Sequence, residues 1–195
     1  CDRLLVTSVA AGPAFEGGNI SCGTGSVAGA ICSVDIACNP EKGFYDGNVR
    51  TIQDKIPCGI CGTGVIETVA ELLKNEIIDE TGLYIDDFFE TGFLLSGTNG
   101  EKQIPDIQNN ENIVFTQKDI REFQMAKAAV RAGIDILISQ YGINTEEIKN
   151  VYLAGGFGFH LNIEKAISVG LLPGEVCDKF KVVGNSSLGG MVKFL

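Results

Sequence analysis

The sequence has few basic residues and no long hydrophobic run. Its 15 Lys and Arg residues are outnumbered by 25 Asp and Glu residues, which gives a formal net charge of -10 over 195 residues. Such an excess of negative charge argues against binding to nucleic-acid phosphates or to an anionic membrane. No apolar stretch approaches the roughly 20 residues that a membrane-spanning helix needs, and no signal-peptide pattern opens the chain. We therefore expect a cytoplasmic protein with no nucleic-acid and no membrane partner.

The common nucleotide-binding signatures are missing as well. The chain contains no Gly-Lys-Ser or Gly-Lys-Thr triplet and so has no P-loop. The stretch Gly155-Gly-Phe-Gly158 does not have the GxGxxG spacing, and the strand predicted after it ends at Gly184 instead of at the acidic residue that would bind a ribose. These absences disfavour a P-loop ATPase and a dinucleotide-binding Rossmann unit.

Soft metal ligands are too sparse for a paired zinc or iron–sulfur knuckle. Seven cysteines, an odd number in a chain without a secretion signal, fit reduced thiols better than a disulfide framework. The single CxxC, Cys58-Gly-Ile-Cys61, has no second CxxC to complete a tetrahedral site, and His160 is the only histidine. We predict no metal site, and Cys58 and Cys61 are the residues that would hold one if this prediction is wrong.

Two glycine-rich turns are the most informative features that are present. An apolar stretch, Val151-Tyr-Leu-Ala154, runs directly into Gly155-Gly-Phe-Gly158, and Gly59-Ile-Cys-Gly-Thr-Gly64 leads into a second helical pattern. Glycine leaves no Cβ in the way, so a ligand can approach the unpaired N–H groups at the start of the helix that follows. Each turn is equally compatible with a ligand site and with tight packing of a strand against a helix.

The order of the apolar patterns predicts an α/β protein. The clearest helix covers residues 116–141, with Thr116 as its N-cap, Asp119 three residues on and Gly142 as its stop. Between residues 79 and 112, two short apolar runs predict a strand pair or a surface insertion with a hairpin turn at 98–101. The other predicted elements are strands at 4–9, 27–36, 48–53, 151–154 and 180–183, and helices at 65–77, at 163–168 and from about 186. This order is typical of an open sheet with ligand-facing loops.

Five blocks of residues, in order along almost the whole chain, resemble the C-terminal ATPase region of the reductive activators of corrinoid proteins. The first contains Ala10-Ala-Gly-Pro-Ala-Phe-Glu-Gly17, and the fourth contains Leu153-Ala-Gly-Gly-Phe-Gly158. Five blocks in the same order are more specific than any single glycine motif. The blocks cover residues 10–17 with 20–23 and 29–31, residues 59–64, residues 115–121 with 126–129, residues 153–158 and residues 183–187.

The resemblance implies a fold and an activity. That family belongs to the ASKHA superfamily of acetate and sugar kinases, Hsp70 and actin. The chain would therefore be a ribonuclease-H-like half of an actin-like ATPase fold, with a mixed sheet flanked by helices and an inserted strand pair. ATP hydrolysis would drive the one-electron reduction of an inactive Co(II) corrinoid protein to Co(I), with the electron supplied by an iron–sulfur domain of the same polypeptide. ATP or ADP with Mg²⁺ would be the cofactor, a corrinoid protein would be the partner, and the protein could form a homodimer.

The resemblance also implies site residues. Glu16 is the carboxylate we expect to orient water or a metal ion in the nucleotide cleft, and the alternative is that it caps neighbouring backbone amides. Residues Leu153–Gly158, the end of a strand and its turn, would be the adenosine motif that lines the nucleotide. The expected nucleotide-binding residues are Gly155, Gly156, Phe157 and Gly158 in this turn, and Gly62, Thr63 and Gly64 in the other.

One departure from the superfamily pattern limits what the chain would do alone. No Asp-x-Gly-Thr turn, the type that forms the superfamily's phosphate hairpins, occurs in the sequence. We expect residues 1–195 to be a partial ASKHA-type nucleotide-binding domain with residues 79–112 inserted, to lack the phosphate-loop and iron–sulfur regions, and to hydrolyse ATP poorly or not at all. The alternatives are an acetate- or sugar-kinase-like phosphotransferase domain and a non-catalytic metal or interaction module built around CxxC.

Overall fold

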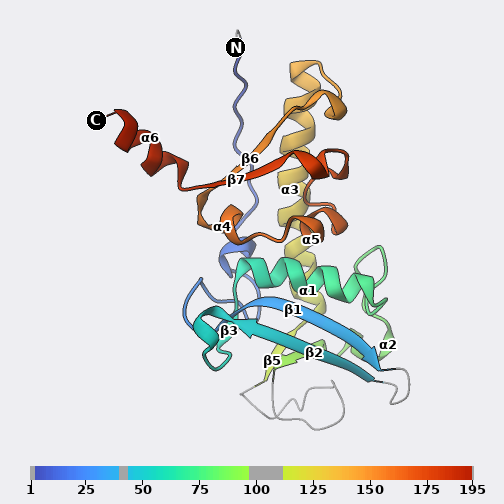
Figure 1. Cartoon of the computed structure of the whole chain (residues 1–195). Coiled ribbons are helices and arrows are strands. Elements are labelled where there is room, and N and C mark those ends of the chain that lie inside the picture. The colour runs from blue at the N-terminus through green and yellow to red at the C-terminus, as the bar shows by residue number, and fades with distance from the viewer. Residues whose placement is uncertain (1–2, 40–43, 97–111, 195) are drawn as a thin grey trace.

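The computed structural model describes residues 3–39, 44–96 and 112–194 (Figure 1). Its α-helices and strands are β1 (Ala30–Asn39), β2 (Phe44–Thr51), β3 (Gly59–Ile60), α1 (Gly62–Lys74), α2 (Asp86–Phe89), β4 (Phe93–Ser96), β5 (Ile113–Phe115), α3 (Gln117–Tyr141), β6 (Val151–Ala154), α4 (Gly155–His160), α5 (Ile163–Ser168), β7 (Phe180–Gly184) and α6 (Ser186–Phe194). Short 3-10 turns are η1 (Ala14–Glu16), η2 (Ile52–Asp54), η3 (Thr145–Glu147) and η4 (Gly174–Lys179). Among the described residues, no helix combines the length and the apolar content that a membrane span would need.

The main sheet has the strand order β2-β1-β3 and is mixed, as the sequence predicted. β1 runs antiparallel to β2 and parallel to β3, so Ile31 lies opposite both Thr51 and Ile60. The β1–β2 register shifts between Ile31 and Ser33. This irregularity lies at the end of the sheet next to α1, and bulges of this kind often lie beside functional sites.

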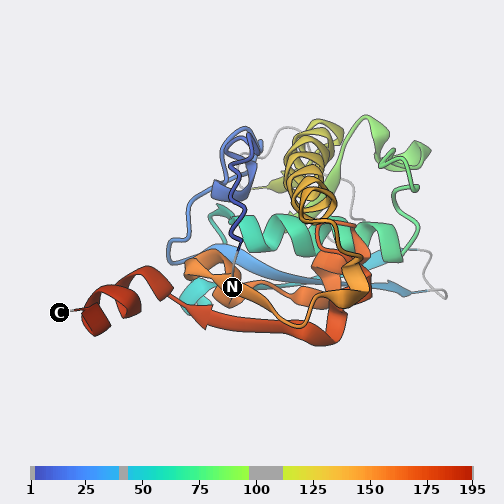
Figure 2. The same ribbon diagram turned by 90° about the horizontal axis from the view of Figure 1, so that it is seen from above.

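Helix α1 forms the centre of the core. Every residue from Gly62 to Leu72 is buried, and Val65, Ile66 and Leu72 are fully covered. Figures 1 and 2 show α1 lying between the β1–β3 sheet and α5. The apolar spacing that predicted this helix therefore corresponds to its packing against β1. The polar residues of the helix, Thr63, Glu67, Thr68 and Glu71, are buried as well.

Helix α3 has the ends that the sequence predicted. Thr116 and Asp119 form a capping box, and Gly142 ends the helix in the left-handed conformation. The residues before η1 were predicted to form a strand at 4–9, and this prediction is wrong. They run along α3, where Val9 lies against Gly133, and no described strand pairs with them.

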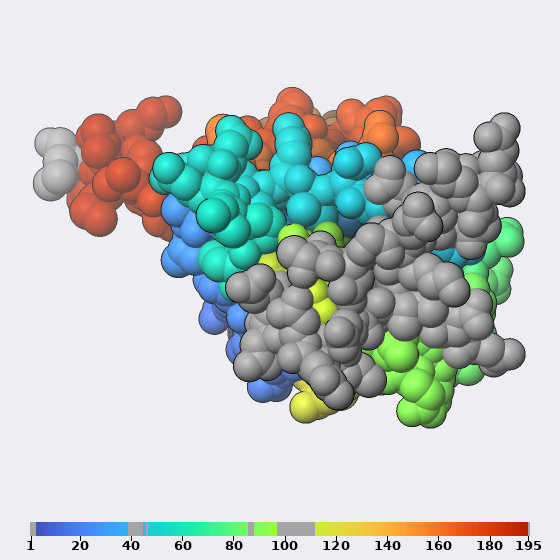
Figure 3. Space-filling model, turned by 90° about the horizontal axis from the view of Figure 1, so that it is seen from below, coloured from blue at the N-terminus to red at the C-terminus, as the bar shows by residue number. Residues whose placement is uncertain are grey.

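The segment after α1 carries one strand of a strand pair, and the second strand, β5, lies just past residue 112. β4 pairs antiparallel with β5, whereas Tyr84 makes an isolated bridge with Ile78. The hairpin turn predicted at residues 98–101 lies outside the described residues. Figure 3, which views the molecule from below, shows β2 at the surface on this side.

The last third of the chain forms a smaller unit. β6 and β7 pair in parallel, with Val151 opposite Phe180, in a sheet of two strands within the described residues. The glycines after β6 were expected to form a turn, but they form the short helix α4. Helix α6 begins where the sequence predicted it, has no buried residue and projects from the body (Figures 1, 2 and 3).

Candidate nucleotide cleft

A cleft of about 930 Å³ opens between the end of the β1–β2 sheet and helix α4. It gathers residues from both glycine-rich turns, from the η1 turn and from the strands of the main sheet. Its lining residues are Phe15, Glu16, Gly25, Ser26, Cys32, Ser33, Arg50, Thr51, Ile52, Gln53, Asp54, Cys61, Thr63, Glu67, Gly156, Phe157 and His160. Segments that are more than 100 residues apart in the sequence therefore meet in one hollow.

The structure brings four of the expected site residues into this cleft. Glu16, Thr63, Gly156 and Phe157 all line it. The two walls touch where the ring of Phe157 packs on the ring of Phe15, with 5.6 Å between the ring centroids. The η1 turn and helix α4 are therefore joined by an aromatic contact at the edge of the cleft.

Four other expected glycines lie near the cleft without lining it. Gly62 and Gly64 are buried, and a Cβ at either position would collide with the carbonyl group of Phe15 or of Ile31, respectively. Gly158 is buried beside Leu153, whereas Gly155 has a φ of 90° that only glycine adopts easily. These glycines shape the turns that position Thr63, Gly156 and Phe157.

The carboxylate of Glu16 is exposed at the cleft. None of the described residues donates a hydrogen bond to it, so the alternative of a backbone cap is not seen in the structure. It is therefore open to a group in the cleft.

The two cysteines of the CxxC point to different neighbours. The exposed Cys58 thiol lies 3.6 Å from the carbonyl oxygen of Ala28, whereas the buried Cys61 thiol lies 3.3 Å from the carbonyl oxygen of Ile31 and 3.3 Å from Thr63 Oγ1. Within the part of the chain that the structure describes, no group of three or more His, Cys, Asp or Glu side chains could hold a metal ion. The two thiols thus differ in their exposure and in their hydrogen-bond neighbours.

Three further residues line the cleft that no sequence pattern predicted, namely Arg50, Ser33 and Glu67. Arg50 lies opposite Ser33 across β1 and β2, and no described residue forms a hydrogen bond or ion pair with its guanidinium group. Burial raises the pKa of the neighbouring Cys32 thiol, with a further increase from Cys61 that the charge of Arg50 opposes. Strand pairing brings Ser33 and Arg50 together, and Glu67 reaches Ser33 from helix α1. No local pattern in the sequence predicts these contacts.

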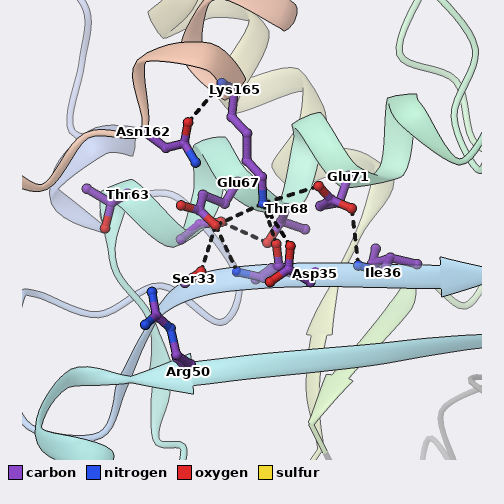
Figure 4. Close-up of polar contacts among 12 residues, drawn as sticks. Ser33, Asp35, Ile36, Arg50, Thr63, Glu67, Thr68, Glu71, Asn162 and Lys165 are labelled. Carbon is purple, nitrogen blue, oxygen red and sulfur yellow. Dashed lines mark hydrogen bonds and ion pairs between the residues drawn. The ribbon is translucent and has the colours of Figure 1, made fainter.

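A buried ion network lies behind the cleft and joins α5 to α1 and β1 (Figure 4). The ammonium group of Lys165 lies 3.0 Å from Glu67 Oε2 and 3.2 Å from Glu71 Oε1, and it donates to the carbonyl oxygen of Val34 at 2.6 Å. The exposed carboxylate of Asp35 lies 3.6 Å away. One cation thus connects helix α5 to α1 and β1, beside the cleft.

The pKa shifts in this network follow from its contacts. Burial alone would raise the pKa of Glu71, but the hydrogen bond from the Ile36 N–H and the contacts with Lys165 and Lys74 outweigh it and lower the pKa below 4.5. For Lys165 burial acts to lower the pKa, and the hydrogen bonds and charges of Glu67 and Glu71 raise it above 10.5 instead. Glu71 and Lys165 are therefore both held in their charged forms at neutral pH.

Comparison with known proteins places this chain in a family. The family described as the C-terminal domain of RACo, the ASKHA domain, matches residues 1–195. The corrinoid activation enzyme RamQ of Eubacterium limosum is 30% identical over 205 residues, which cover 100% of this chain and 34% of RamQ. The [Co(II) methylated amine-specific corrinoid protein] reductase of Methanosarcina barkeri is 32% identical over 203 residues, which cover 96% of this chain and 34% of the reductase.

A solved structure supports the same grouping. The reductive activator for corrinoid, iron-sulfur protein matches with a TM-score of 0.78 and 38% identity over 95% of this chain and 29% of that chain. The chain spans about a third of the length of the curated relatives it matches. The predicted fold class is confirmed by this match and by the mixed sheet with its flanking helices. Because the family match extends over every residue, the chain belongs to the family of the C-terminal ASKHA domain of RACo.

Proposed function

We propose that the cleft binds the adenine nucleotide of an ATP-dependent reductive activator of a corrinoid protein. The observation that carries the proposal is the meeting of Glu16, Thr63, Gly156 and Phe157 in one cleft. These residues come from three separate blocks of the sequence, and the chain belongs to an ASKHA family throughout its length. A shared cleft is expected if the blocks serve one ligand, whereas unrelated packing turns would not need one.

The chemistry of the cleft favours one orientation of the nucleotide. The start of α1 presents unpaired N–H groups and a partial positive charge beside Thr63, and Arg50 adds a cation without a described partner. The phosphates of the nucleotide therefore fit the end of the cleft formed by the start of α1 and Arg50. Helix α4 presents open backbone at Gly156 and an aromatic face at Phe157, which suit the adenosine end.

The residues of the cleft fit Mg²⁺ that arrives with a nucleotide. The described residues do not form an all-protein metal cage, but Mg²⁺ commonly uses one or two carboxylates together with substrate phosphates and water. Glu16 and Glu67 line the cleft and supply such oxygens. Bound Mg²⁺ would neutralise phosphate charge, and Glu16 would orient it or its water.

The donor set does not fit an iron–sulfur cluster in the described part of the chain. Six described cysteines are free, and they do not gather into a group of cluster ligands. In the proposed scheme, the cluster and the superfamily's phosphate hairpins belong to other regions of a longer protein. That protein would act in the cytoplasm and could form a homodimer. It would use ATP to return a Co(II) corrinoid protein to Co(I) with an electron from the cluster.

The names of the relatives favour this activity over the alternatives. RamQ is a corrinoid activation enzyme, the Methanosarcina barkeri protein is a reductase of a Co(II) corrinoid protein, and the solved relative is a reductive activator. None of these three is a kinase. Neither the phosphotransferase nor the CxxC module gains support from a specific contact in the structure.

Calorimetric titration of the 195-residue chain with ADP and Mg²⁺ tests nucleotide binding. We expect saturable binding, and we expect Phe157→Ala to weaken it by about tenfold because the aromatic wall is lost. Met125→Ala serves as the control, since Met125 is exposed on α3 and does not line the cleft. Absence of ADP binding by the folded wild-type chain, or equal affinities for the wild-type and Phe157→Ala chains, would overturn the assignment of the cleft.

A further inference from the structure

The carboxylate of Glu67 is held by only one of its two oxygens. Oε2 accepts hydrogen bonds from Ser33 Oγ at 2.9 Å, from the Val34 N–H at 3.0 Å and from Lys165 Nζ at 3.0 Å. Figure 4 shows these donors converging on Glu67 from β1 and α5. No described residue donates to Oε1. A carboxylate that is anchored from two different elements cannot turn freely, so Oε1 has a fixed direction.

The free oxygen faces the cleft. The residue as a whole is 93% buried, with only 7% exposed, yet it lines the cleft. Among the described residues, Oε1 of Glu67 is not one of the side-chain atoms that are both fully buried and without a hydrogen-bond partner, so it is not sealed from solvent. A side chain that is so deeply buried and still presents an acceptor to a hollow is typical of a built binding site.

Lys165 fixes the carboxylate of Glu67 in place but does not neutralise its charge fully. It is shared between two buried carboxylates, Glu67 and Glu71, and it also donates to the Val34 carbonyl group. The exposed Lys74 contacts Glu71 alone. Glu67 therefore keeps negative character at the cleft surface, and that favours a hydrogen-bond donor over a phosphate oxygen.

The position of Glu67 on α1 limits which ligand groups can donate to its free oxygen. Thr63 lies four residues earlier on the same helix face and also lines the cleft, one turn closer to the helix start that suits phosphates. The ligand groups next to a nucleotide's phosphates that carry O–H donors are the sugar hydroxyls and the waters on a bound Mg²⁺. Both sources offer the same chemistry to a carboxylate oxygen.

We propose that Oε1 of Glu67 binds an O–H donor of the nucleotide complex, either a sugar hydroxyl or a Mg²⁺-bound water, and that Lys165 is the positioning residue for it. This inference rests on the proposed nucleotide function of the cleft. It assigns a ligand contact to a residue that the glycine motifs do not include, and it gives the Glu67–Lys165 ion pair a role in recognition.

The test compares Glu67→Gln with Glu71→Gln by calorimetric titration. The two glutamates belong to the same network and the same helix, but only Glu67 lines the cleft. We expect Glu67→Gln to weaken binding of ADP with Mg²⁺ by about 10- to 100-fold, because a hydrogen bond to a charged group is lost. Glu71→Gln should stay within about threefold of wild type, because its contacts with the network do not reach the ligand.

Two changes of ligand identify the source of the O–H group. If the defect of Glu67→Gln persists with EDTA but disappears with 2′,3′-dideoxy-ADP, the donor is a sugar hydroxyl. If the defect disappears with EDTA, the donor is a Mg²⁺-bound water. Equal affinities for Glu67→Gln and Glu71→Gln would overturn the inference while leaving the proposed function intact, whereas a wild-type chain that binds no ADP would overturn both.

A second pair of variants tests positioning and guards against misfolding. Lys165→Met should weaken ADP binding in the wild-type background but cause no further loss when it is added to Glu67→Gln, because both changes act on the same contact. Additive losses would contradict a positioning role. If Glu67→Gln does not fold, Ser33→Ala decides, since it removes one of the three bonds that anchor Oε2 and should weaken ADP binding while Glu71→Gln does not.

Discussion

Gly62 and Gly64, at the start of α1, are buried, whereas Gly155 and Gly156, at the start of α4, have open space where a side chain would project. In the first turn, a Cβ would meet the carbonyl group of Phe15 or of Ile31. In the second, no atom lies within 4 Å of a Cβ built on Gly155 or Gly156. The first pair of glycines therefore permits close backbone packing, and the second pair leaves the cleft wall bare.

This difference assigns separate tasks to the two turns. In the first turn, Thr63 reaches the cleft because its glycine neighbours bring α1 tightly against η1 and β1. In the second turn, Gly156 itself lines the cleft, beside Phe157. A glycine-rich helix start can thus support a site through packing behind it or through open backbone at its surface.

The largest expected effect is a loss of stability when a methyl group is added in the first glycine-rich turn. Gly64→Ala should destabilise the chain by about 3 kcal/mol or more, because the new methyl group is forced into the backbone of β1 and the core cannot expand without strain. Urea unfolding followed by circular dichroism measures this change. Met191→Ala on α6 is the matched surface control, since Met191 is 61% exposed, and it should stay within about 0.5 kcal/mol of wild type. A Gly64→Ala chain as stable as this control would show that the packing account of the first turn is wrong.

Elements with a local cause could be predicted from the sequence. The capping box at Thr116 and Asp119, the glycine stop at Gly142 and the apolar stripe of α1 act within one or two helical turns, so their patterns are visible in the sequence. The mixed sheet and the presence of Glu16, Thr63, Gly156 and Phe157 near one site came from ordered blocks that resemble a known family. The structure then supplied their common cleft.

Features with a tertiary cause could not be predicted in this way. The strand predicted at residues 4–9 has the right apolar content, but a strand also needs a partner, and no described strand pairs with these residues. Arg50 and Glu67 reach the cleft through strand pairing and through the contact with Lys165, which is 98 residues away from Glu67 in the sequence. Such distances leave no periodic pattern to detect.

A change of pH should loosen the link between the two turns. Glu71 and Lys165 belong to the network that ties α5, just after the second turn, to α1, which begins in the first. The pKa of Glu71 is lowered in the folded chain, so its contribution to stability is complete above pH 4.5 and is lost as the pH falls through the folded pKa. The free energy of unfolding should therefore fall below pH 4.5, with a slope of at most about 1.4 kcal/mol per pH unit from this one group.

Urea unfolding between pH 3 and 7, in wild type and in Glu71→Gln, measures this contribution. The variant should be less stable at neutral pH, because the buried contacts with Lys165 and with the Ile36 N–H are weakened. Its stability should also depend less on pH below 4.5, since the titrating group is gone. Parallel pH profiles for the two chains would mean that Glu71 does not contribute to the acid sensitivity.

The smallest stability effect, and the sharpest contrast with the first turn, is expected for Gly156→Ala. Gly156 lies inside α4 with no atom within 4 Å of its added methyl group, so the change should leave stability unaltered or raise it by up to about 1 kcal/mol through helix propensity. The same methyl group projects where Gly156 lines the cleft, so ADP should bind about tenfold more weakly. Urea unfolding and calorimetric titration of one preparation measure both quantities. A loss of stability comparable to that of Gly64→Ala would make the two turns alike, and unchanged ADP affinity would remove the second turn from the nucleotide wall. If Gly156→Ala keeps or gains stability but loses affinity for ADP, a packing role for Gly156 cannot explain the result, because loss of packing would lower stability as well.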